Sequence, residues 1–349
     1  MLIISELQCK YDDQTVVDGI SFTLEKGDIC CLLGPSGCGK TTVLRALAGF
    51  QAISKGEISL QGRAMSTPSM TIPPEQRNIG MVFQDYALFP HLTVVDNVKF
   101  GLHKREATSQ QNISKALLEL VNLSELGERY PHQISGGQQQ RVALIRAMAT
   151  GPRVLLLDEP FSNLDAELKK RLNLEVRDIL KQHQISAILV THDQEEAFAF
   201  GDKIGVLDKG KLQQWDTAFN LYHQPANRFV ANFIGQGSFI PGLSIDQYSV
   251  DTEMGTLKTE VAHDWPKGSP IEILLRPDDI TLSRSATDGI TATVEKKVFS
   301  GSATLYSFKL PTGSCVESLL PSHHNYDVGE SIRIRAEIEH LVAFSKAEL

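Results

Sequence analysis

The sequence predicts an α/β domain built on a largely parallel sheet, followed by a smaller all-β domain. Up to about residue 235, short apolar runs of strand length alternate with stretches of helical periodicity, the pattern of a parallel sheet flanked by helices. From residue 236 onward the runs are β-branched and are separated by Gly, Pro and Asp. A chain of 349 residues with 42% hydrophobic side chains is long enough for two cores, so we expect domains at 1–235 and 236–349.

In the first domain, several apolar runs have the length of buried strands: residues 19–24, 29–33, 79–83, 154–157, 187–191 and 204–207. Helical spacing and composition occur between them, at residues 40–47, 114–121, 136–149 and 166–181. The segment from about 90 to 150 is rich in helical signals. We therefore expect it to form a helical subdomain inserted in the strand order.

The second domain is expected to be a small β barrel, because its strand candidates are short and are separated by turn residues. The candidates are residues 271–275, 290–294, 303–310 and 331–338.

Charge, leader and cysteine content narrow the class of protein. The formal net charge is -8 and no basic stretch stands out, so nucleic acid is not an expected partner. The first residues carry no cationic leader or sustained apolar segment, and no apolar run approaches the roughly 18 residues that cross a bilayer. The five cysteines lack metal-ligand spacing, which is typical of free thiols. We expect a cytosolic chain that borrows any membrane role from a partner.

Residues 34–41 (GPSGCGKT) match the phosphate-binding loop GxxxxGK[ST], between an expected strand and an expected helix. Glycines allow backbone N–H groups to converge on phosphate oxygens at a helix N-terminus, Lys40 reaches the β and γ oxygens, and Thr41 ligates Mg²⁺. A glycine-rich turn without a ligand is the alternative, and it leaves the flanking strand and helix unexplained. The residues expected to bind nucleotide here are Gly34, Pro35, Ser36, Gly37, Cys38, Gly39, Lys40, Thr41 and Thr42.

Two carboxylates, Asp158 and Glu159, end the apolar run 154–157. Ligands of open α/β sheets bind at the carboxyl ends of the strands. Asp158 is therefore expected to hold Mg²⁺ and Glu159 to polarise the attacking water. An acidic helix cap at a strand end is the alternative for such a pair taken alone.

Residues 134–138 (ISGGQ), continued by 139–147 (QQRVALIRA), resemble the signature of ATP-binding cassette (ABC) ATPases, where the first residue is more often Leu. The serine and glycine amides would open a helix whose positive end meets a γ-phosphate. The other family motifs follow in order. Gln84 in 82–85 (VFQD) resembles the Q-loop, Asp165 in 162–165 (SNLD) the D-loop, and His192 in 190–193 (VTHD) the switch histidine.

The resemblance implies a P-loop ATPase that uses ATP and Mg²⁺. Tyr11, shortly before Val16, resembles the aromatic residue that stacks on adenine. The implied catalytic residues are Glu159, His192, Gln84 and Lys40, and the implied Mg²⁺ ligands are Thr41, Gln84 and Asp158. One phosphate loop and one signature per chain imply a head-to-tail homodimer. The residues that act across its interface would be Ser135, Gly136, Gly137, Gln138 and Asp165.

Residues 72–94 (IPPEQRNIGMVFQDYALFPHLTV) closely resemble ATP-binding subunits of importers for sugars, polyamines, sulfate and ferric iron. Residues 227–235 (NRFVANFIG) are similar to the hinge of these subunits. Residues 275–280 (LRPDDI) resemble a motif of their regulatory, OB-like β domain, with Asp278 in place of Glu. The run 84–93 (QDYALFPHLT) looks most similar to ferric-iron importers, which implies iron as solute, with sugar, polyamine and sulfate as alternatives.

Membrane permease subunits are the partners that the resemblance implies, together with a solute-binding protein acting indirectly and a peripheral location on the cytoplasmic face of the inner membrane. Tyr86, Phe89 and Pro90 are expected either to be exposed to the permease or to pack the helical subdomain. The β domain either regulates the motor or is a passive lid. Cys38 lies at a helix start, where a thiolate is favoured.

Two rival classes are distinguished by features of the chain. A nucleic-acid-associated ABC ATPase would carry tandem cassettes, long coiled coils or basic arms, and none is visible in the sequence. A small-molecule P-loop kinase would lack residues 134–138 and would not dimerise on ATP.

Overall fold

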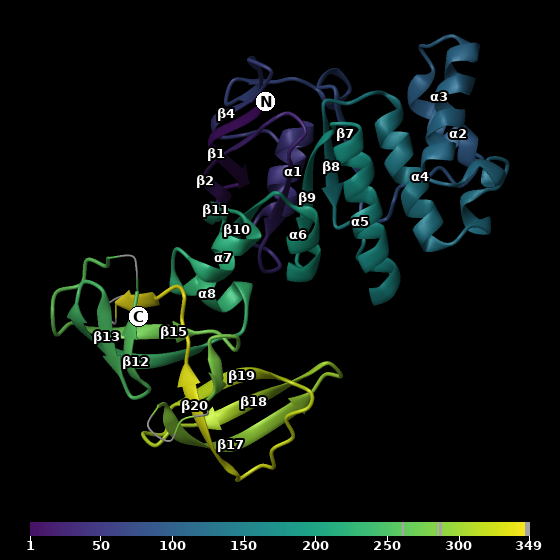
Figure 1. Ribbon diagram of the computed structural model, residues 1–349. Coiled ribbons are helices and arrows are strands. Elements are labelled where there is room, and N and C mark those ends of the chain that lie inside the picture. Colours follow the sequence, from purple (N-terminus) through teal and green to yellow (C-terminus); the bar gives the residue numbers. More distant parts are fainter. Residues whose placement is uncertain (260–261, 284, 286–287, 346–349) are drawn as a thin grey trace. The chain divides into compact units, whose positions relative to one another are not determined.

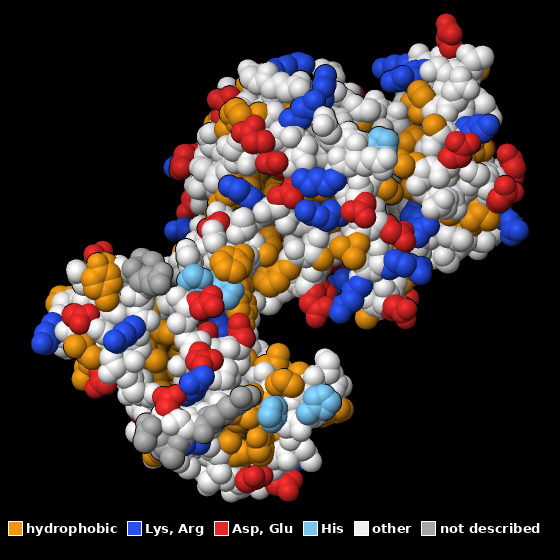
Figure 2. All heavy atoms as spheres, in the orientation of Figure 1, with side chains coloured by type: hydrophobic (Ala, Val, Ile, Leu, Met, Phe, Trp, Pro, Cys, Tyr) orange, Lys and Arg blue, Asp and Glu red, His pale blue; other side chains and the backbone are white. Residues whose placement is uncertain are grey.

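The computed structural model describes residues 1–259, 262–283, 285 and 288–345. The chain divides into two compact units, an N-terminal unit of residues 1–218 and a C-terminal unit of residues 219–349 (Figure 1). On the face shown in Figure 2, basic and acidic side chains are interspersed over the N-terminal unit. None of the helices formed by the described residues combines the length and the apolar character that a bilayer crossing requires.

The central sheet of the N-terminal unit, in which every residue is described, has six strands in the order β11-β10-β3-β9-β8-β7. The five strands from β10 to β7 run parallel, and β11 is an antiparallel edge strand. Their bounds are β3 (Ile29–Leu33), β7 (Ile79–Val82), β8 (Val154–Asp158), β9 (Ser186–Thr191), β10 (Lys203–Asp208) and β11 (Lys211–Asp216). The continuous apolar runs are buried strands, as the sequence predicted.

A second, antiparallel sheet in the same unit was only partly foreseen. Its order is β2-β1-β4-β5-β6, with β1 (Leu2–Tyr11), β2 (Gln14–Leu24), β4 (Lys55–Leu60), β5 (Arg63–Thr67) and β6 (Met70–Thr71). The alternation of β1 is interrupted because Glu6 has a φ of 49° and the register with β2 shifts between Ile4 and Leu7. Such irregularities hide a strand from a period-two search.

Three helices lie alongside the central sheet: α1 (Lys40–Ala48), α5 (Ala166–Gln182) and α6 (Gln194–Phe200) (Figure 1). One hydrophobic core combines residues of both sheets and α1, among them Ile4, Leu32 and Leu44. A second core, with Val98, Leu118 and Ile145, unites α2 (Val94–Lys99), α3 (Ala107–Leu120) and α4 (Gly136–Ala149). Helix α3 begins earlier than the predicted residue 114. The prediction missed its first turns because they are polar and carry no apolar periodicity.

The described part of the C-terminal unit begins within α7 (Ala218–His223). It continues with α8 (Arg228–Ile234) and two antiparallel five-stranded sheets. One has the order β14-β13-β12-β15-β21, with β12 (Ser238–Asp246), β13 (Ser249–Thr252), β14 (Gly255–Lys258), β15 (Pro270–Leu275) and β21 (Val342–Ser345). The other has the order β16-β20-β17-β18-β19, with β16 (Ile280–Leu282), β17 (Ile290–Phe299), β18 (Ala303–Lys309), β19 (Cys315–Pro321) and β20 (Ser331–Ala336). Both sheets contribute to one core, which gives the expected barrel-like β unit.

The boundary between the units lies earlier than the predicted position after residue 235. Residues 219–235 belong to the C-terminal unit because α8 packs on its sheet, with Ala231 against Leu274 and Phe344. The buried Arg276 also donates hydrogen bonds to the carbonyl oxygens of Ala231, at 3.0 Å, and Gly235, at 2.9 Å. A boundary placed by composition alone misses such packing.

Candidate active site

The phosphate loop, residues 34–41, joins the end of β3 to the start of α1. Gly37 and Gly39 have φ angles of 80° and 104°, in the left-handed region that favours glycine. Gly34 is needed for a different reason, because a Cβ there would lie 2.3 Å from the carbonyl oxygen of Leu207. A Cβ at Gly37 would meet no atom within 4 Å, so the loop has open space on that side, as a phosphate-binding turn requires.

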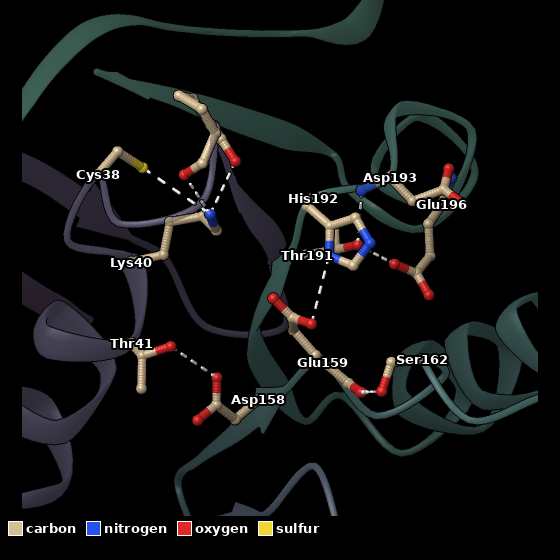
Figure 3. A network of polar contacts seen from close by, with 12 residues as sticks. Cys38, Lys40, Thr41, Asp158, Glu159, Ser162, Thr191, His192, Asp193 and Glu196 are labelled. Atoms are coloured by element: carbon tan, nitrogen blue, oxygen red, sulfur yellow. Dashed lines mark hydrogen bonds and ion pairs between the residues drawn. The ribbon is translucent and has the colours of Figure 1, made fainter. Parts of the chain in front are cut away.

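The side chain of Lys40 lies inside this loop and is 6% exposed. Its Nζ donates to the carbonyl oxygens of Gly34, at 2.7 Å, and Pro35, at 3.0 Å, and lies 3.8 Å from Cys38 Sγ (Figure 3). The described contacts of this ammonium are therefore neutral dipoles, and its charge remains available to an anion.

Cys38 differs from the expectation that a helix start favours its thiolate. The residue is buried, and burial raises the pKa of its thiol more than the neighbouring Lys40 ammonium lowers it. The prediction of a thiolate at Cys38 was wrong, because desolvation outweighs the helix terminus and the cation here. Cys38 is a neutral thiol at pH 7.

Thr41 and Asp158 meet across the loop and the sheet. Thr41 Oγ1 donates to Asp158 Oδ1 at 3.2 Å, which links the first turn of α1 to the end of β8. Burial raises the pKa of Asp158; the hydrogen bond from Thr41 opposes this shift, and the charge of Glu159 adds to it. A carboxylate whose charge is disfavoured in this way gains from an adjacent cation, so this pair of oxygen ligands suits Mg²⁺.

Gln84, the third predicted Mg²⁺ ligand, is exposed just beyond the end of β7. Its backbone carbonyl accepts a hydrogen bond from Asn163 Nδ2 at 3.2 Å. Within the described chain no hydrogen bond joins its side chain to Thr41 or Asp158. The structure thus brings together two of the three predicted ligands.

Glu159 faces His192 at the ends of two adjacent strands, with 3.3 Å between Glu159 Oε2 and His192 Nδ1 (Figure 3). The backbone of Glu159 has a φ of 45°, an unfavourable conformation for a side chain with a Cβ. Hydrogen bonds hold it there. Its N–H donates to the Val190 carbonyl at 3.0 Å, and its own carbonyl accepts from the N–H and hydroxyl of Ser162. The carboxylate is thus aimed by its backbone.

The signature serine, Ser135, is the N-cap of α4. Its Oγ accepts from Gln138 N at 3.4 Å, while Gln138 Oε1 accepts from Ser135 N at 2.8 Å, which forms a capping box. Gly137 allows close packing, because a Cβ there would lie 3.1 Å from the Leu168 side chain on α5. Ser135 and Gly136 are exposed on this turn, at the end of the helix where N–H groups have no partner within the helix.

Asp165, Tyr11 and Val16 lie in three distinct settings. Asp165 caps α5 by accepting from Leu168 N at 3.0 Å. Tyr11 is 41% exposed at the hairpin between β1 and β2. The Val16 carbonyl lies beside the phosphate loop, 3.0 Å from where a Cβ of Gly39 would be.

The segment after Gln84 corrects one sequence expectation. Tyr86 is 5% exposed, so it is not available on the surface as predicted. Tyr86 and Ala87 both have positive φ, and Arg146 of α4 donates to their carbonyl oxygens at 2.8 and 2.6 Å. The guanidinium also lies over the Phe89 ring. The signature helix therefore holds this turn, and Tyr86 packs inward as the alternative reading had it.

Sequence reasoning also passed over the residues around His192. Thr191, Asp193 and Glu196 form a hydrogen-bonded cluster there, completed by Lys169 of α5. A lysine next to other charged residues on an amphipathic helix carries no sequence signal of this kind.

The fold and the site define a P-loop nucleotide hydrolase with a helix-starting signature motif. Family profiles match the chain twice, as ABC transporter over residues 17–162 and as TOBE domain over residues 273–344. A spermidine/putrescine import ATP-binding protein of Oleidesulfovibrio alaskensis is 41% identical over 83% of this chain and 80% of its own. One from Bacteroides thetaiotaomicron is 38% identical over 94% of this chain and 70% of its own. The chain therefore belongs to the ABC family, as an ATP-binding subunit of an importer.

Solved structures agree with this assignment. A dimeric post-hydrolysis structure of the ATP-binding cassette MJ0796 with ADP and Pi, and a dimeric structure of the same bacterial ABC transporter cassette, each match with a TM-score of 0.55 and 26% identity. Each match covers 62% of this chain and 98% of the other. The protein is an ATPase whose hydrolysis of ATP drives uptake.

Proposed function

We propose that two copies of this chain close head to tail over ATP and Mg²⁺, and that they power a permease that imports a polyamine. The observation that carries the catalytic part is the meeting of Glu159 with His192 beside Asp158 and Thr41. These four side chains come from the ends of β8 and β9 and from the phosphate-loop helix, the edge of a parallel sheet where ligands bind.

In this proposal the phosphates of ATP lie in the loop, and Lys40 exchanges its carbonyl contacts for phosphate oxygens. Glu159 accepts a proton from, or orients, the water that attacks the γ-phosphate. His192 Nδ1 lies 3.3 Å from the Glu159 carboxylate. In this proposal the histidine also contacts the γ-phosphate and registers its loss. Thr41 and Asp158, with Gln84 moving in, would hold Mg²⁺. The bound ion would neutralise charge on the phosphate oxygens.

The dimer part rests on the helix start of α4. The hydroxyl of the exposed Ser135 and the backbone of the exposed Gly136 would complete the phosphate site of a second copy, with Gly137, Gln138 and Asp165 at the same interface. The two solved structures reported above are dimeric, which supports this arrangement. The single phosphate loop of the chain is in accord with it.

Glu159→Gln tests the catalytic part. The amide keeps the shape of the side chain but accepts no proton, so kcat should fall by about 10²- to 10⁴-fold while ATP binding persists. ATP should then hold the variant as a dimer in sedimentation experiments. Glu195→Gln makes the same charge change at an exposed position of α6, and its turnover should stay within about twofold of the parent. Near-parent phosphate release by Glu159→Gln would remove Glu159 from this role.

The solute is proposed on the relatives rather than on the site. Both reported relatives are spermidine/putrescine import proteins, which supports the polyamine alternative, whereas nothing among them supports the ferric-iron prediction. In this proposal the permease and the solute-binding protein, rather than the motor site, select the solute. A peripheral place at the cytoplasmic membrane face, through the permease, follows from the same proposal.

Reconstitution tests the solute. The chain and its permease in lipid vesicles should hydrolyse ATP faster when a spermidine-loaded binding protein is added, since the loaded protein favours the closed motor. The same binding protein without solute is the control. Stimulation by a ferric-iron, sulfate or sugar-loaded protein in place of the polyamine-loaded one would contradict the proposal.

A further inference from the structure

We propose that Lys169 of α5 is a positioning residue that holds His192 against Glu159. Because Asp165 of the D-loop caps α5, the lysine also links the D-loop to the proposed hydrolysis site. The proposal rests on the role proposed above for His192. Lys169 does not touch the nucleotide-binding loop in the described contacts. It acts through the residue that follows the histidine.

Lys169 contacts the carboxylates of Asp193 and Glu196, which follow His192 in the chain. Lys169 Nζ lies 2.8 Å from Asp193 Oδ2 and 3.5 Å from Glu196 Oε1. The Lys169 side chain is 19% exposed, that of Asp193 34% and that of Glu196 only 3%. Ion pairs shielded from water in this way are stronger and less screened than surface pairs.

The backbone on both sides of His192 is fixed by the same cluster, as Figure 3 shows for Thr191, Asp193 and Glu196. Thr191 Oγ1 accepts from Asp193 N at 3.0 Å and donates to Glu196 Oε2. Asp193 Oδ1 accepts from Glu196 N at 3.1 Å. The histidine is thus the middle residue of a three-residue turn whose two ends are tied down.

Charge explains why the lysine is needed. Asp193 and Glu196 are two acidic groups beside one ammonium, and burial raises the pKa of Glu196. Although burial alone lowers the pKa of Lys169, its hydrogen bond to Asp193 and the charge of Glu196 raise it above the ordinary value. Without the ammonium, α5 would lose its ion pairs to Asp193 and Glu196, and the histidine next to Asp193 would no longer be held toward Glu159.

The position of Lys169 on α5 links the D-loop to the turn that carries His192. Lys169 N donates to the Asp165 carbonyl at 2.9 Å, in the first turn of the helix that Asp165 caps. A displacement of the D-loop therefore moves the lysine and, through Asp193, the histidine. Shifts of about 1 Å at a reacting group can cost about 100-fold in rate.

The next residue offers a matched control. Lys170 lies on the same turn and pairs with Glu195 at 2.8 Å, but both side chains are more than two-thirds exposed. Removing Lys170 makes the same charge change in the same helix without touching the turn around His192. A fall in kcat on replacing either lysine would reflect the loss of positive charge in general. A fall on replacing Lys169 alone would reflect the position of His192.

The test compares Lys169→Met, Lys169→Arg and Lys170→Met in steady-state ATP hydrolysis by the full chain. Lys169→Met should lower kcat by about 10- to 100-fold and leave KM for ATP within about threefold. Lys169→Arg should restore most of the loss, and Lys170→Met should stay within about twofold of the parent. A purely structural role would instead lower the amount of folded protein without this split between kcat and KM.

Asp193→Asn keeps the test decisive if Lys169→Met does not fold. Asparagine caps helices as well as aspartate does, so α6 keeps its N-cap while the ion pair is lost, and the same fall in kcat is expected. In a His192→Ala background, Lys169→Met should add less than about a threefold further loss in sensitive phosphate-release measurements, because both changes act on one unit.

Each outcome decides between the proposals. Parent-like kcat in Lys169→Met or in Asp193→Asn, or a full multiplicative loss on top of His192→Ala, would overturn the positioning role. Parent-like turnover of His192→Ala alone would instead overturn the proposed role of the histidine.

Discussion

The thiol of Cys38 lies within the phosphate loop, where burial and the adjacent lysine act in opposite directions. Burial dominates, so the group stays protonated at neutral pH. Its low exposure, 4%, also limits access. Cys315, by contrast, is exposed and accounts for the accessible thiol among the described cysteines.

Labelling of Cys38 tests this setting. In a Cys315→Ser variant, a thiol reagent should modify Cys38 slowly at pH 7. The rate should rise by about tenfold per pH unit, because the raised pKa keeps the thiolate a minor form that grows with pH. Bound ATP should slow the reaction further by covering the loop. Mass spectrometry of the labelled peptide over time measures both effects. Equal rates with and without ATP would contradict the placement of phosphate beside this loop.

Strain at Glu159 is a second property at the scale of one residue. Its positive φ is maintained by hydrogen bonds to Val190 and Ser162, and this geometry sets the direction of the carboxylate toward His192. Strained backbone of this kind persists only where its surroundings determine it, and it concentrates at functional sites. The serine of the D-loop thus contributes to the site through the backbone of its neighbour.

At the scale of the element, helix α1 is held at both ends. Its start forms the phosphate loop, and its end is held by Arg77, which is 1% exposed. The guanidinium donates to the carbonyl oxygens of Ala46 and Leu47, both at 2.9 Å, and of Ile72 at 2.6 Å. Ala46 and Leu47 belong to the last turn of α1, where carbonyls lack partners within the helix, and the bond to Ile72 ties this helix end to a neighbouring segment. Burial lowers the pKa of Arg77 to about 10, so it stays charged at neutral pH.

Arg77→Met should therefore lower the free energy of unfolding of the N-terminal unit by about 3 kcal/mol or more, since several buried carbonyls lose their donor. The free energy of unfolding of Arg77→Lys should lie between those of Arg77→Met and the parent, because an ammonium cannot make the several hydrogen bonds of the planar guanidinium. Urea unfolding followed by circular dichroism gives the measurement. Arg63→Met, at an exposed position of β5, is the control and should change the free energy by less than about 0.5 kcal/mol. A similar loss in both variants would contradict the helix-end role.

Helix α4 likewise supports a different segment at each of its ends. Its N-terminal turn carries the signature serine, and Arg146 near its C-terminal end holds the Tyr86–Ala87 turn after Gln84. Asn97, fully buried on α2, supports the same segment by donating to the carbonyl oxygens of Phe89, Leu92 and Thr93. The segment that follows the Q-loop is therefore built on the helices of the inserted subdomain.

For the whole molecule, the parallel order of the central sheet is what brings together the residues of the proposed hydrolysis site. Strands β3, β9 and β8 are adjacent, although β3 is far from the other two in sequence. Their carboxyl ends bring the phosphate loop, His192 and Glu159 to one edge. A parallel sheet places all such ends on the same side, so residues from distant segments meet without a special contact between the connecting loops.

The sequence by itself determined the elements whose signal is local. The phosphate loop, the carboxylates after β8 and the signature turn are contiguous motifs, and five buried strands read as continuous apolar runs. In these cases the geometry depends on neighbours along the chain. Glycines permit the left-handed turn at residues 37 and 39, and an apolar run of strand length is buried in a sheet covered on both faces.

Tertiary structure alone decided the rest, because burial and pairing depend on residues that are far apart in sequence. It turned Tyr86 inward, kept the Cys38 thiol protonated, and placed residues 219–235 with the β unit through Arg276. It also set Lys169 against Asp193 behind His192, a contact between two helices that no spacing along one helix encodes. Desolvation and ion pairing act through space, so their outcome is settled only when the sheet order brings the partners together.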